Sequence, residues 1–273
     1  MEDSFNRRSI TRDKILSKAD LLKQKFRFKK SLGQNIFIGN TQNLLNLTNF
    51  MDDDFIIEVG TGTGDITKEI AKRVEFVRSY EIDERLKEFI NENIIFYKNI
   101  EVKYMDFLLE DKFPESFKFF SNLPYSQAAE ILKKCSMINS LKEGYFMIQK
   151  ELGERIISKE GSKKYGAISI FLQTFFSFKS MKEFNKDLFY PKPKVDSIFI
   201  YFKRIREWND EFELYETFLK DIFSRRRKKI KKYLSDYLND MNIDTNLRPE
   251  DIKVEDYIKI YENFIRSKDK SHS

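Results

Sequence analysis

Histidine is almost absent from this 273-residue sequence, because the single one, His272, is the penultimate residue of a polar C-terminal tail. Serine and cysteine catalytic triads, histidine general bases and the usual zinc sites all need a histidine inside the folded body. These classes of enzyme are therefore excluded. We expect any reaction to proceed without an imidazole.

Cysteine and long apolar runs are missing as well. The single cysteine, Cys135, has no partner for an intramolecular disulfide, which fits a reducing compartment and excludes a thiolate metal cluster. No apolar run reaches the ~18 residues of a membrane-spanning helix, and residues 1–20 are charged throughout, unlike a signal peptide. We expect a cytoplasmic protein with no metal site and no membrane anchor.

The abundant residues indicate a folded chain with a basic surface. Hydrophobic residues make up 41% of the sequence and include 27 phenylalanines, enough for a sizeable core. The net charge of +6 and the isoelectric point of about 9.0 favour a polyanionic partner. The alternative is that the many lysines reflect a biased genomic composition, so charge by itself does not decide.

Short β-type runs alternate with helical stretches between residues 55 and 201. Helices are expected after Asp65, after Asp83, and over residues 127–135 and 166–175. The expected strands are residues 55–59, 76–81, 100–104, 118–121, 145–149 and 197–202. This alternation predicts an α/β domain with a mostly parallel sheet that helices cover on both faces.

The character of the sequence changes near residue 206. No glycine follows Gly166, and residues 210–223, 225–238 and 254–265 all show helical spacing of apolar residues. We predict an N-terminal extension (1–28), an α/β domain (29–206) and a small all-helical domain with a polar tail (207–273).

A glycine-rich turn after the first expected strand indicates a nucleotide site. Gly60, Gly62 and Gly64 separate an apolar strand from a helix, so the backbone there can approach a ligand closely. Glu81, at the end of the next strand, is placed to accept hydrogen bonds from two ribose hydroxyls. Both features also fit a dinucleotide, and the turn by itself could be only structural.

Two further strand ends carry polar side chains. Asp106 closes the third expected strand and Asn122 closes the fourth, and ligands of open α/β sheets bind at such carboxyl ends. Asp106 is placed to bind the amino group of a cofactor's adenine, although an acid at a strand end is more often a helix cap.

The tetrapeptide Asn122-Leu123-Pro124-Tyr125 is the most specific feature of the sequence. An adenine amino nitrogen is a poor nucleophile, because its lone pair is delocalised into the ring. The Asn122 side-chain oxygen and the Leu123 carbonyl, held rigid by Pro124, could accept its two hydrogens, while Tyr125 stacks on the base. This chemistry relies on positioning and needs no histidine. The alternative is an ordinary turn, but Gly60, Glu81 and Asp106 upstream favour catalysis.

Several sequence blocks resemble the ribosomal RNA adenine dimethyltransferases over about residues 28–240. Residues 30–37, Lys-Ser-Leu-Gly-Gln-Asn-Ile-Phe, are similar to the family's Lys-x-x-Gly-Gln-Asn-Phe-Leu motif, and residues 149–152, Gln-Lys-Glu-Leu, to its Gln-Lys-Glu-Val segment. Residues 161–166 and 189–197 resemble two further blocks. They are more similar to the small-subunit, kasugamycin-sensitivity branch than to the erythromycin-resistance branch. Phe37 and Thr61 depart from the family pattern, which usually has leucine and proline there.

The resemblance implies a Rossmann-like class I methyltransferase with a seven-stranded sheet that uses S-adenosylmethionine. It implies dimethylation of two adjacent adenosines near the 3′ end of small-subunit ribosomal RNA, within an immature 30S-type particle, and we expect a monomer. Asn122 and Tyr125 would lie at the target base, with Phe189 as a second stacking wall. The implied cofactor contacts are Asn35, the backbone of Phe37, Gly60, Glu81, Asp106 and Asn122.

A basic run near the C-terminus places seven positive charges within eight residues. Positive charge at the start of the expected helix would oppose its macrodipole, so an external polyanion explains the run better than a solvated helix face does. The residues expected to contact RNA are Arg225, Arg226, Arg227, Lys228, Lys229, Lys231 and Lys232.

Other functions remain as alternatives. The same fold could serve as a non-catalytic RNA-binding assembly factor, or as an erythromycin-resistance-type methyltransferase acting on large-subunit RNA. A nicotinamide oxidoreductase would explain neither residues 122–125 nor the basic run. The intact tetrapeptide favours the enzyme, because RNA binding alone does not need that geometry.

Overall fold

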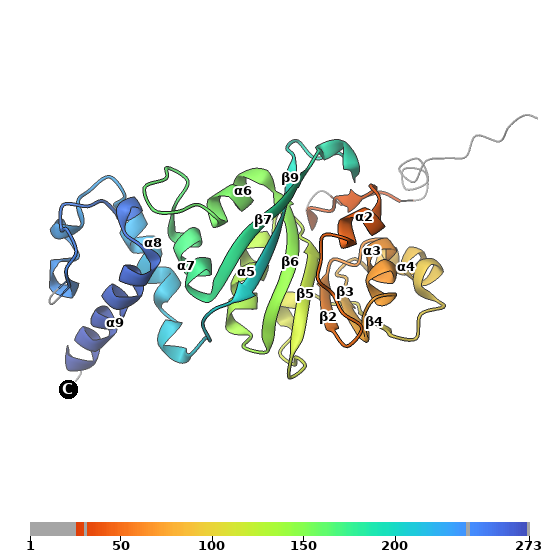
Figure 1. The fold of residues 1–273 in the computed structure, drawn as a ribbon, viewed down its shortest axis with the longest axis horizontal. Helices are drawn as coiled ribbons and strands as arrows, with labels where there is room; N and C mark the ends of the chain where they lie inside the picture. Colours follow the sequence, from red (N-terminus) through yellow and green to blue (C-terminus); the bar gives the residue numbers. More distant parts are fainter. Residues whose placement is uncertain (1–25, 30–31, 239–240, 272–273) are drawn as a thin grey trace, which may run out of the picture.

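A seven-stranded sheet forms the centre of the computed structural model, which describes residues 26–29, 32–238 and 241–271 (Figure 1). Across the sheet the strands follow the order β4-β3-β2-β5-β6-β9-β7. The strands from β4 to β6 are parallel, and β9 is antiparallel to both neighbours. Their bounds are β2 (Phe55–Val59), β3 (Phe76–Tyr80), β4 (Ile100–Lys103), β5 (Phe117–Asn122), β6 (Leu141–Gln149), β7 (Phe176–Phe184) and β9 (Ser197–Arg204). The predicted α/β fold with a mostly parallel seven-stranded sheet is confirmed.

Helices cover both faces of this sheet (Figure 1). Ile56 and Phe120 join an apolar cluster with α2 and α3, whereas their neighbours Ile57 and Phe119 join a second cluster with α5, α6 and α7. Burial of both faces explains why the strands read as nearly continuous apolar runs. The helices are α2 (Thr41–Leu45), α3 (Asp65–Ala71), α4 (Lys87–Ile94), α5 (Ala128–Met137), α6 (Lys150–Ile156) and α7 (Ala167–Phe175).

Strand β7 was not predicted from the sequence. It follows α7 directly and lies at the edge of the sheet, where it pairs only with β9. Its side chains at Lys179 and Lys182 are exposed. Lysines are typical of edge strands, but they break the apolar pattern by which a buried strand is recognised.

The region after β9 is helical, as predicted, and contains no strand within the described residues. Helices α8 (Tyr215–Ser224) and α9 (Val254–Ser271) lie beside α7 (Figure 1). They continue the apolar cluster of α7, in which Phe171 and Phe175 lie together with Tyr215 and Tyr261.

The predicted helix over residues 225–238 is wrong. Helix α8 ends at Ser224, and short 3₁₀ turns at Ile230–Lys232 and Ser235–Tyr237 follow it. The main-chain amides of Ile230 and Lys231 donate instead to the carbonyls of Leu247 and Thr245. Closely spaced like charges also disfavour a continuous helix here.

A two-stranded sheet connects the N-terminal segment to the loop before β9. Strand β1 (Ile36–Phe37) pairs antiparallel with β8 (Phe189–Tyr190), so that Phe37 lies opposite Phe189. Residues 1–25 of the predicted extension, Lys30 of the family motif and His272 lie outside the described residues. Among the helices of the described segments, none combines the length and apolar character that crossing a membrane requires.

Candidate active site

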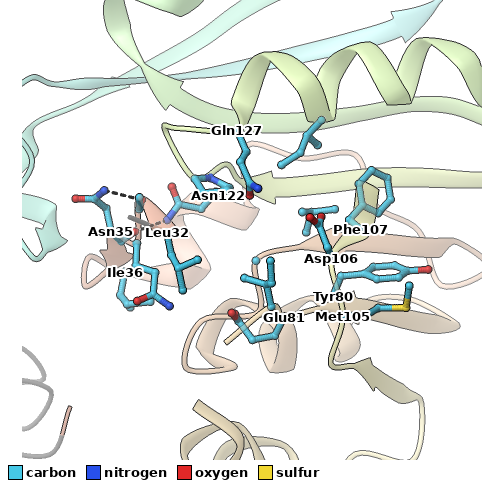
Figure 2. A pocket seen from close by; sticks show the side chains of 17 residues that line it. Leu32, Asn35, Ile36, Tyr80, Glu81, Met105, Asp106, Phe107, Asn122 and Gln127 are labelled. Atoms are coloured by element: carbon cyan, nitrogen blue, oxygen red, sulfur yellow. Dashed lines mark hydrogen bonds between the residues drawn. The ribbon is translucent and has the colours of Figure 1, made fainter. Parts of the chain in front are cut away.

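A cavity opens at the carboxyl ends of β2, β3 and β5. The chain order reverses between β2 and β5, and open α/β sheets bind ligands at such switch points. The cavity holds about 640 Å³ of space, part of it open to solvent. Six of the predicted site residues line it, namely Asn35, Gly60, Glu81, Asp106, Asn122 and Pro124 (Figure 2).

The glycine turn leaves room for a ligand against the backbone. Gly60 and Gly62 adopt left-handed φ angles of 87° and 59°, which favour glycine. A Cβ at Gly60 would take up space at the cavity wall, where the nearest atom is the Asn122 carbonyl oxygen at 3.7 Å. The Gly60 amide donates to the Tyr80 carbonyl at 2.9 Å, which ties the turn to the end of β3.

Glu81 lies directly after β3 and is only 5% exposed. Its two carboxylate oxygens accept hydrogen bonds from the main-chain amides of Gly62 and Asp83, each at 2.9 Å. Burial nevertheless raises the pKa of Glu81 to about 7. Each oxygen keeps a second lone pair, so the ionised carboxylate can also accept two hydroxyl donors such as those of a ribose.

Asp106 both lines the cavity and caps a short helix. Its carboxylate accepts a hydrogen bond from the Leu108 amide at 2.9 Å, at the start of the 3₁₀ turn Phe107–Leu109. Asp106 therefore caps this turn and also forms part of the cavity wall.

The apolar walls of the cavity were not predicted. They include Ile36, Ile82, Met105, Phe107 and Ile131. Two of these residues could have been predicted as neighbours of the acids in the sequence, because Ile82 follows Glu81 and Met105 precedes Asp106. Apolar surfaces between two acids suit a flat ring whose polar edges meet the carboxylates.

Gln34 is a polar residue of the site that was not predicted from the sequence. Its side-chain amide donates to the Asp83 carboxylate at 2.9 Å, and Arg85 binds the same carboxylate at 2.5 Å. The pKa of Asp83 is held below its usual value, chiefly by the hydrogen bonds from Arg85. Gln34 thus fastens the N-terminal segment beside Glu81.

The orientation of the Asn122 amide is fixed by the N-terminal segment. Its Nδ2 donates to the Asn35 carbonyl oxygen at 2.7 Å (Figure 2). The Oδ1 atom of the same amide is therefore available to accept a hydrogen bond from a ligand in the cavity. Behind it, the Leu123 amide donates to the Met147 carbonyl at 3.0 Å, and the Gln127 amide donates to the Pro124 carbonyl at 3.0 Å. The tetrapeptide is therefore held at both ends by main-chain hydrogen bonds.

Tyr125 lies next to the cavity and is half-buried. Its hydroxyl shares a hydrogen bond of 2.8 Å with the Ser197 hydroxyl, on the first residue of β9. Burial raises the pKa of Tyr125 above its ordinary value, so the phenol is neutral at physiological pH.

Two predicted site residues face the core instead. Phe37 is 3% exposed and does not line the cavity, and its neighbour Ile36 does. Phe189 is 2% exposed and packs against Phe37 with ring centroids 5.5 Å apart. Pairing of β1 with β8 buries the Phe189 ring in this structure, and the role of Phe189 as a stacking wall stays a prediction.

The basic run follows the carboxyl end of α8, not the start of a helix. Positive charge is favourable at that end, so the macrodipole argument for a polyanion does not hold. Arg226 is held by protein contacts, because its guanidinium binds Glu250 at 3.3 Å and donates to the Lys163 carbonyl at 2.9 Å. Arg227, Lys228 and Lys232 are exposed and have no ion-pair partner among the described residues.

Comparison with known sequences identifies relatives over most of the chain. The family model for ribosomal RNA adenine dimethylase matches residues 25–266. The ribosomal RNA small subunit methyltransferase A of Thermotoga neapolitana is 35% identical over 245 residues, which cover 88% of this chain and 93% of that protein. The protein of the same name from Malacoplasma penetrans is 32% identical over 259 residues, covering 89% and 94%.

Solved structures share the fold at lower identity. A dimethyladenosine transferase from Plasmodium falciparum has a TM-score of 0.68 and 20% identity, covering 83% of this chain and 95% of that one. The 23S rRNA methyltransferase ErmE has a TM-score of 0.62 and 23% identity, with 87% and 98% covered.

Proposed function

This chain belongs to the ribosomal RNA adenine dimethylase family, and from that premise we propose how its site dimethylates adenosine with S-adenosylmethionine. The substrate is small-subunit ribosomal RNA. The finer targets are the exocyclic amino groups of two adjacent adenosines near the RNA's 3′ end, within an immature 30S-type particle in the cytoplasm, and the enzyme acts as a monomer.

The cavity supports binding of S-adenosylmethionine in one orientation. Glu81 would accept the ribose hydroxyls, Asp106 the adenine amino group, and the apolar walls at Ile82 and Met105 would hold the adenine ring. The open space beside Gly60 lets the remaining chain of the cofactor pass along the backbone toward Asn122. When bound, the cofactor supplies an electrophilic methyl group on a positively charged sulfur.

The orientation of Asn122 carries the proposal. Because its Nδ2 is occupied by the Asn35 carbonyl, its Oδ1 is the atom that can accept a hydrogen from the target amino group. The Leu123 carbonyl would accept the second hydrogen. With both hydrogens held, the amino nitrogen turns toward tetrahedral geometry and its lone pair becomes available for the methyl group. The enzyme contributes positioning and preorganised acceptors, and no strong base is needed.

Tyr125 would stack on the target base from one side. Its hydroxyl bond to Ser197 fixes the ring without using the ring face. Base stacking on an aromatic side chain contributes about 1–3 kcal/mol. Phe189 is not part of this proposal.

The direct test is an Asn122→Ala variant, assayed with radiolabelled S-adenosylmethionine and under-methylated small or large ribosomal subunits, followed by nucleoside analysis. We expect dimethyladenosine in the small subunit only. The variant should lose about 10²–10³-fold in rate, as when one preorganised acceptor or donor is removed. An Asn91→Ala variant on the exposed surface of α4 is the matched control.

Each other result would change the proposal in a defined way. Label confined to the large subunit would favour an erythromycin-resistance-type substrate. A wild-type protein that binds cofactor but labels neither subunit would favour a non-catalytic assembly factor. An Asn122→Ala variant as fast as the Asn91→Ala control would remove Asn122 from the catalytic site.

A further inference from the structure

A second, larger groove lies beside the catalytic tetrapeptide at the same edge of the sheet. Gln149 ends β6 and pairs with Ser197, the residue that holds the Tyr125 hydroxyl. Gln149 itself and Asp196, the residue before Ser197, belong to the wall of the groove. A chain that leaves the target position beside Tyr125 can therefore enter the groove directly.

The walls of the groove are unusually basic. Six cationic and three anionic residues line it, contributed by α6, by the loop over residues 161–166 and by the loops on either side of β8. The space within and above it is about 1590 Å³, part of it open to solvent. The lining residues with charge are Lys150, Arg155, Lys163, Lys164, Lys186, Lys194, Glu151, Glu154 and Asp196.

The protein itself neutralises only part of this charge. Lys150 pairs with Glu183 at 2.7 Å, and Lys164 pairs with Glu154. Within the described residues, Arg155, Lys163, Lys186 and Lys194 have no carboxylate partner, and the Lys186 ammonium donates to the Lys194 carbonyl at 3.4 Å. Four cations from different segments thus point to one external polyanion rather than to internal ion pairs.

The loop that carries Lys163 is braced from the C-terminal region. Arg226 donates to the carbonyls of Ser162 and Lys163, at 3.4 and 2.9 Å, and the Gly161 amide donates to the Glu250 carbonyl at 2.7 Å. The same loop is anchored by Tyr165, which is fully buried and donates its hydroxyl to the Ile252 carbonyl at 3.1 Å. The brace keeps its cations at the groove.

We propose that this groove binds the phosphodiester backbone of the RNA strand that flanks the target adenosines. The proposal rests on the function proposed above and adds the path of the substrate. Arg155, Lys163 and Lys194 neutralise consecutive phosphates, and Arg226 acts as a positioning residue that holds the Lys163 loop. Contacts to phosphate do not read sequence, so the groove fixes the register of the strand and leaves base selection to the catalytic site.

The test compares two double variants that remove the same charge. Lys163→Gln with Lys194→Gln removes two groove cations, whereas Lys142→Gln with Lys203→Gln removes two exposed lysines from the opposite edge of the sheet. Binding of a short single-stranded RNA containing the two target adenosines is measured between 50 and 200 mM salt, together with methylation of under-methylated small subunits. We expect the groove variant to lower the slope of log affinity against log salt by about 0.7 per lost contact.

The groove variant should also raise KM for the subunit with little change in kcat, because these residues touch no reacting atom. If the groove variant has the same salt slope and the same KM as the control variant, and the wild-type protein methylates the subunit, the proposal that RNA binds in the groove is overturned but the methyltransferase function is not. Absence of methylation by the wild-type protein would overturn the proposed function itself, and the two failures are therefore distinguishable.

As an independent readout, 4-thiouridine beside the target adenosines should cross-link to residues 150–164 or 186–196, and cross-linking confined to other segments would contradict the proposal.

Discussion

At the scale of single residues, Glu58 in β2 and Glu81 after β3 are two buried carboxyl groups of the sheet. Glu58 is 1% exposed and accepts hydrogen bonds from the hydroxyls of Thr67 and Ser79, each at 2.6 Å. Burial raises the pKa values of Glu58 and Glu81 to about 7 each. The two groups have different tasks, since Glu58 points into the protein between β2 and α3 while Glu81 faces the cavity.

Glu81 should make ligand binding depend on pH. Ribose hydroxyls donate to the ionised carboxylate, so binding should strengthen as pH rises through about 7. For a pKa of about 7, affinity at pH 8 should be about tenfold higher than at pH 6. We would measure this by calorimetry with 5′-methylthioadenosine, whose ribose and adenine are intact but which lacks the amino-acid group. A Glu81→Gln variant should bind weakly at both pH values, and an unchanged pH dependence in that variant would refute the assignment.

Glu58 should make stability depend on pH in the opposite sense. Its folded-state pKa lies above the unfolded value, so its contribution is complete below about pH 4.5 and is lost as pH rises through 7. The loss amounts to about 3 kcal/mol between the two limits. Urea denaturation from pH 5.5 to 8.5 should show that Glu58→Gln flattens this decline, whereas Glu92→Gln on the surface of α4 does not. If the free energies of unfolding of the wild type and of Glu58→Gln change with pH in parallel, the Glu58 carboxyl is ionised throughout this pH range.

At the scale of elements, helix α5 connects the catalytic loop to the far edge of the sheet. It begins at Ala128, separated from the tetrapeptide by two residues, and its carboxyl end is held by Arg204 of β9. The Arg204 guanidinium donates to the carbonyls of Cys135, Ser136, Ile138, Leu141 and Arg206 at 2.8–3.1 Å. Burial lowers the pKa of Arg204 to about 10, which still leaves it charged at neutral pH.

Replacing Arg204 should destabilise the sheet and α5 together. Arg204→Met leaves several buried carbonyls without a donor, and each unsatisfied group costs about 1–3 kcal/mol, so a loss of at least ~3 kcal/mol is expected. Arg204→Lys should retain part of the stability, because one ammonium cannot reach all five carbonyls. Urea denaturation measures both, with Arg206→Met, whose side chain is exposed, as the control. Equal stability of Arg204→Met and the control would show that water replaces the guanidinium.

At the scale of the whole molecule, some cationic side chains are held in contacts with the protein and others are exposed to solvent. In the basic run, Arg225 pairs with Asp221 at 3.2 Å, and Lys229 and Lys231 donate to the Asn246 side chain. Arg226 braces the 161–166 loop. The seven positive charges of the run therefore overstate what the run can offer to RNA, and the exposed Arg227, Lys228 and Lys232 are the strongest candidates for phosphate contacts.

Removing these three cations should lower the salt dependence of RNA binding. For Arg227→Gln, Lys228→Gln and Lys232→Gln together, the slope of log affinity against log salt should fall by about 2 on single-stranded RNA. A triple variant of the exposed Lys112, Lys142 and Lys203 has the same charge and serves as the control. If both triple variants change the slope equally, the effect comes from net charge and not from contacts of the run.

The sequence by itself determined the fold and the polar strand ends that meet at the candidate site. Strand β2 has the bounds that the apolar run 55–59 predicts, because a strand buried on both faces leaves a local signal. The order of strands and polar strand ends along the chain was enough to group Glu81, Asp106 and Asn122 at one site, since the carboxyl ends of parallel strands meet at one edge of the sheet.

Only the tertiary structure decided which side chains those residues meet. The bond from Asn122 to the Asn35 carbonyl joins positions 87 residues apart, and the bond from Gln34 to Asp83 joins positions 49 apart. Burial of Phe189 follows from pairing of β1 with β8, and the end of α8 at Ser224 follows from hydrogen bonds to the loop at Thr245 and Leu247. Periodicity records only whether a segment is buried and along which face, because it is a property of neighbours in sequence. The partner across a long loop depends on how distant segments pack, and no local pattern of residues carries that information.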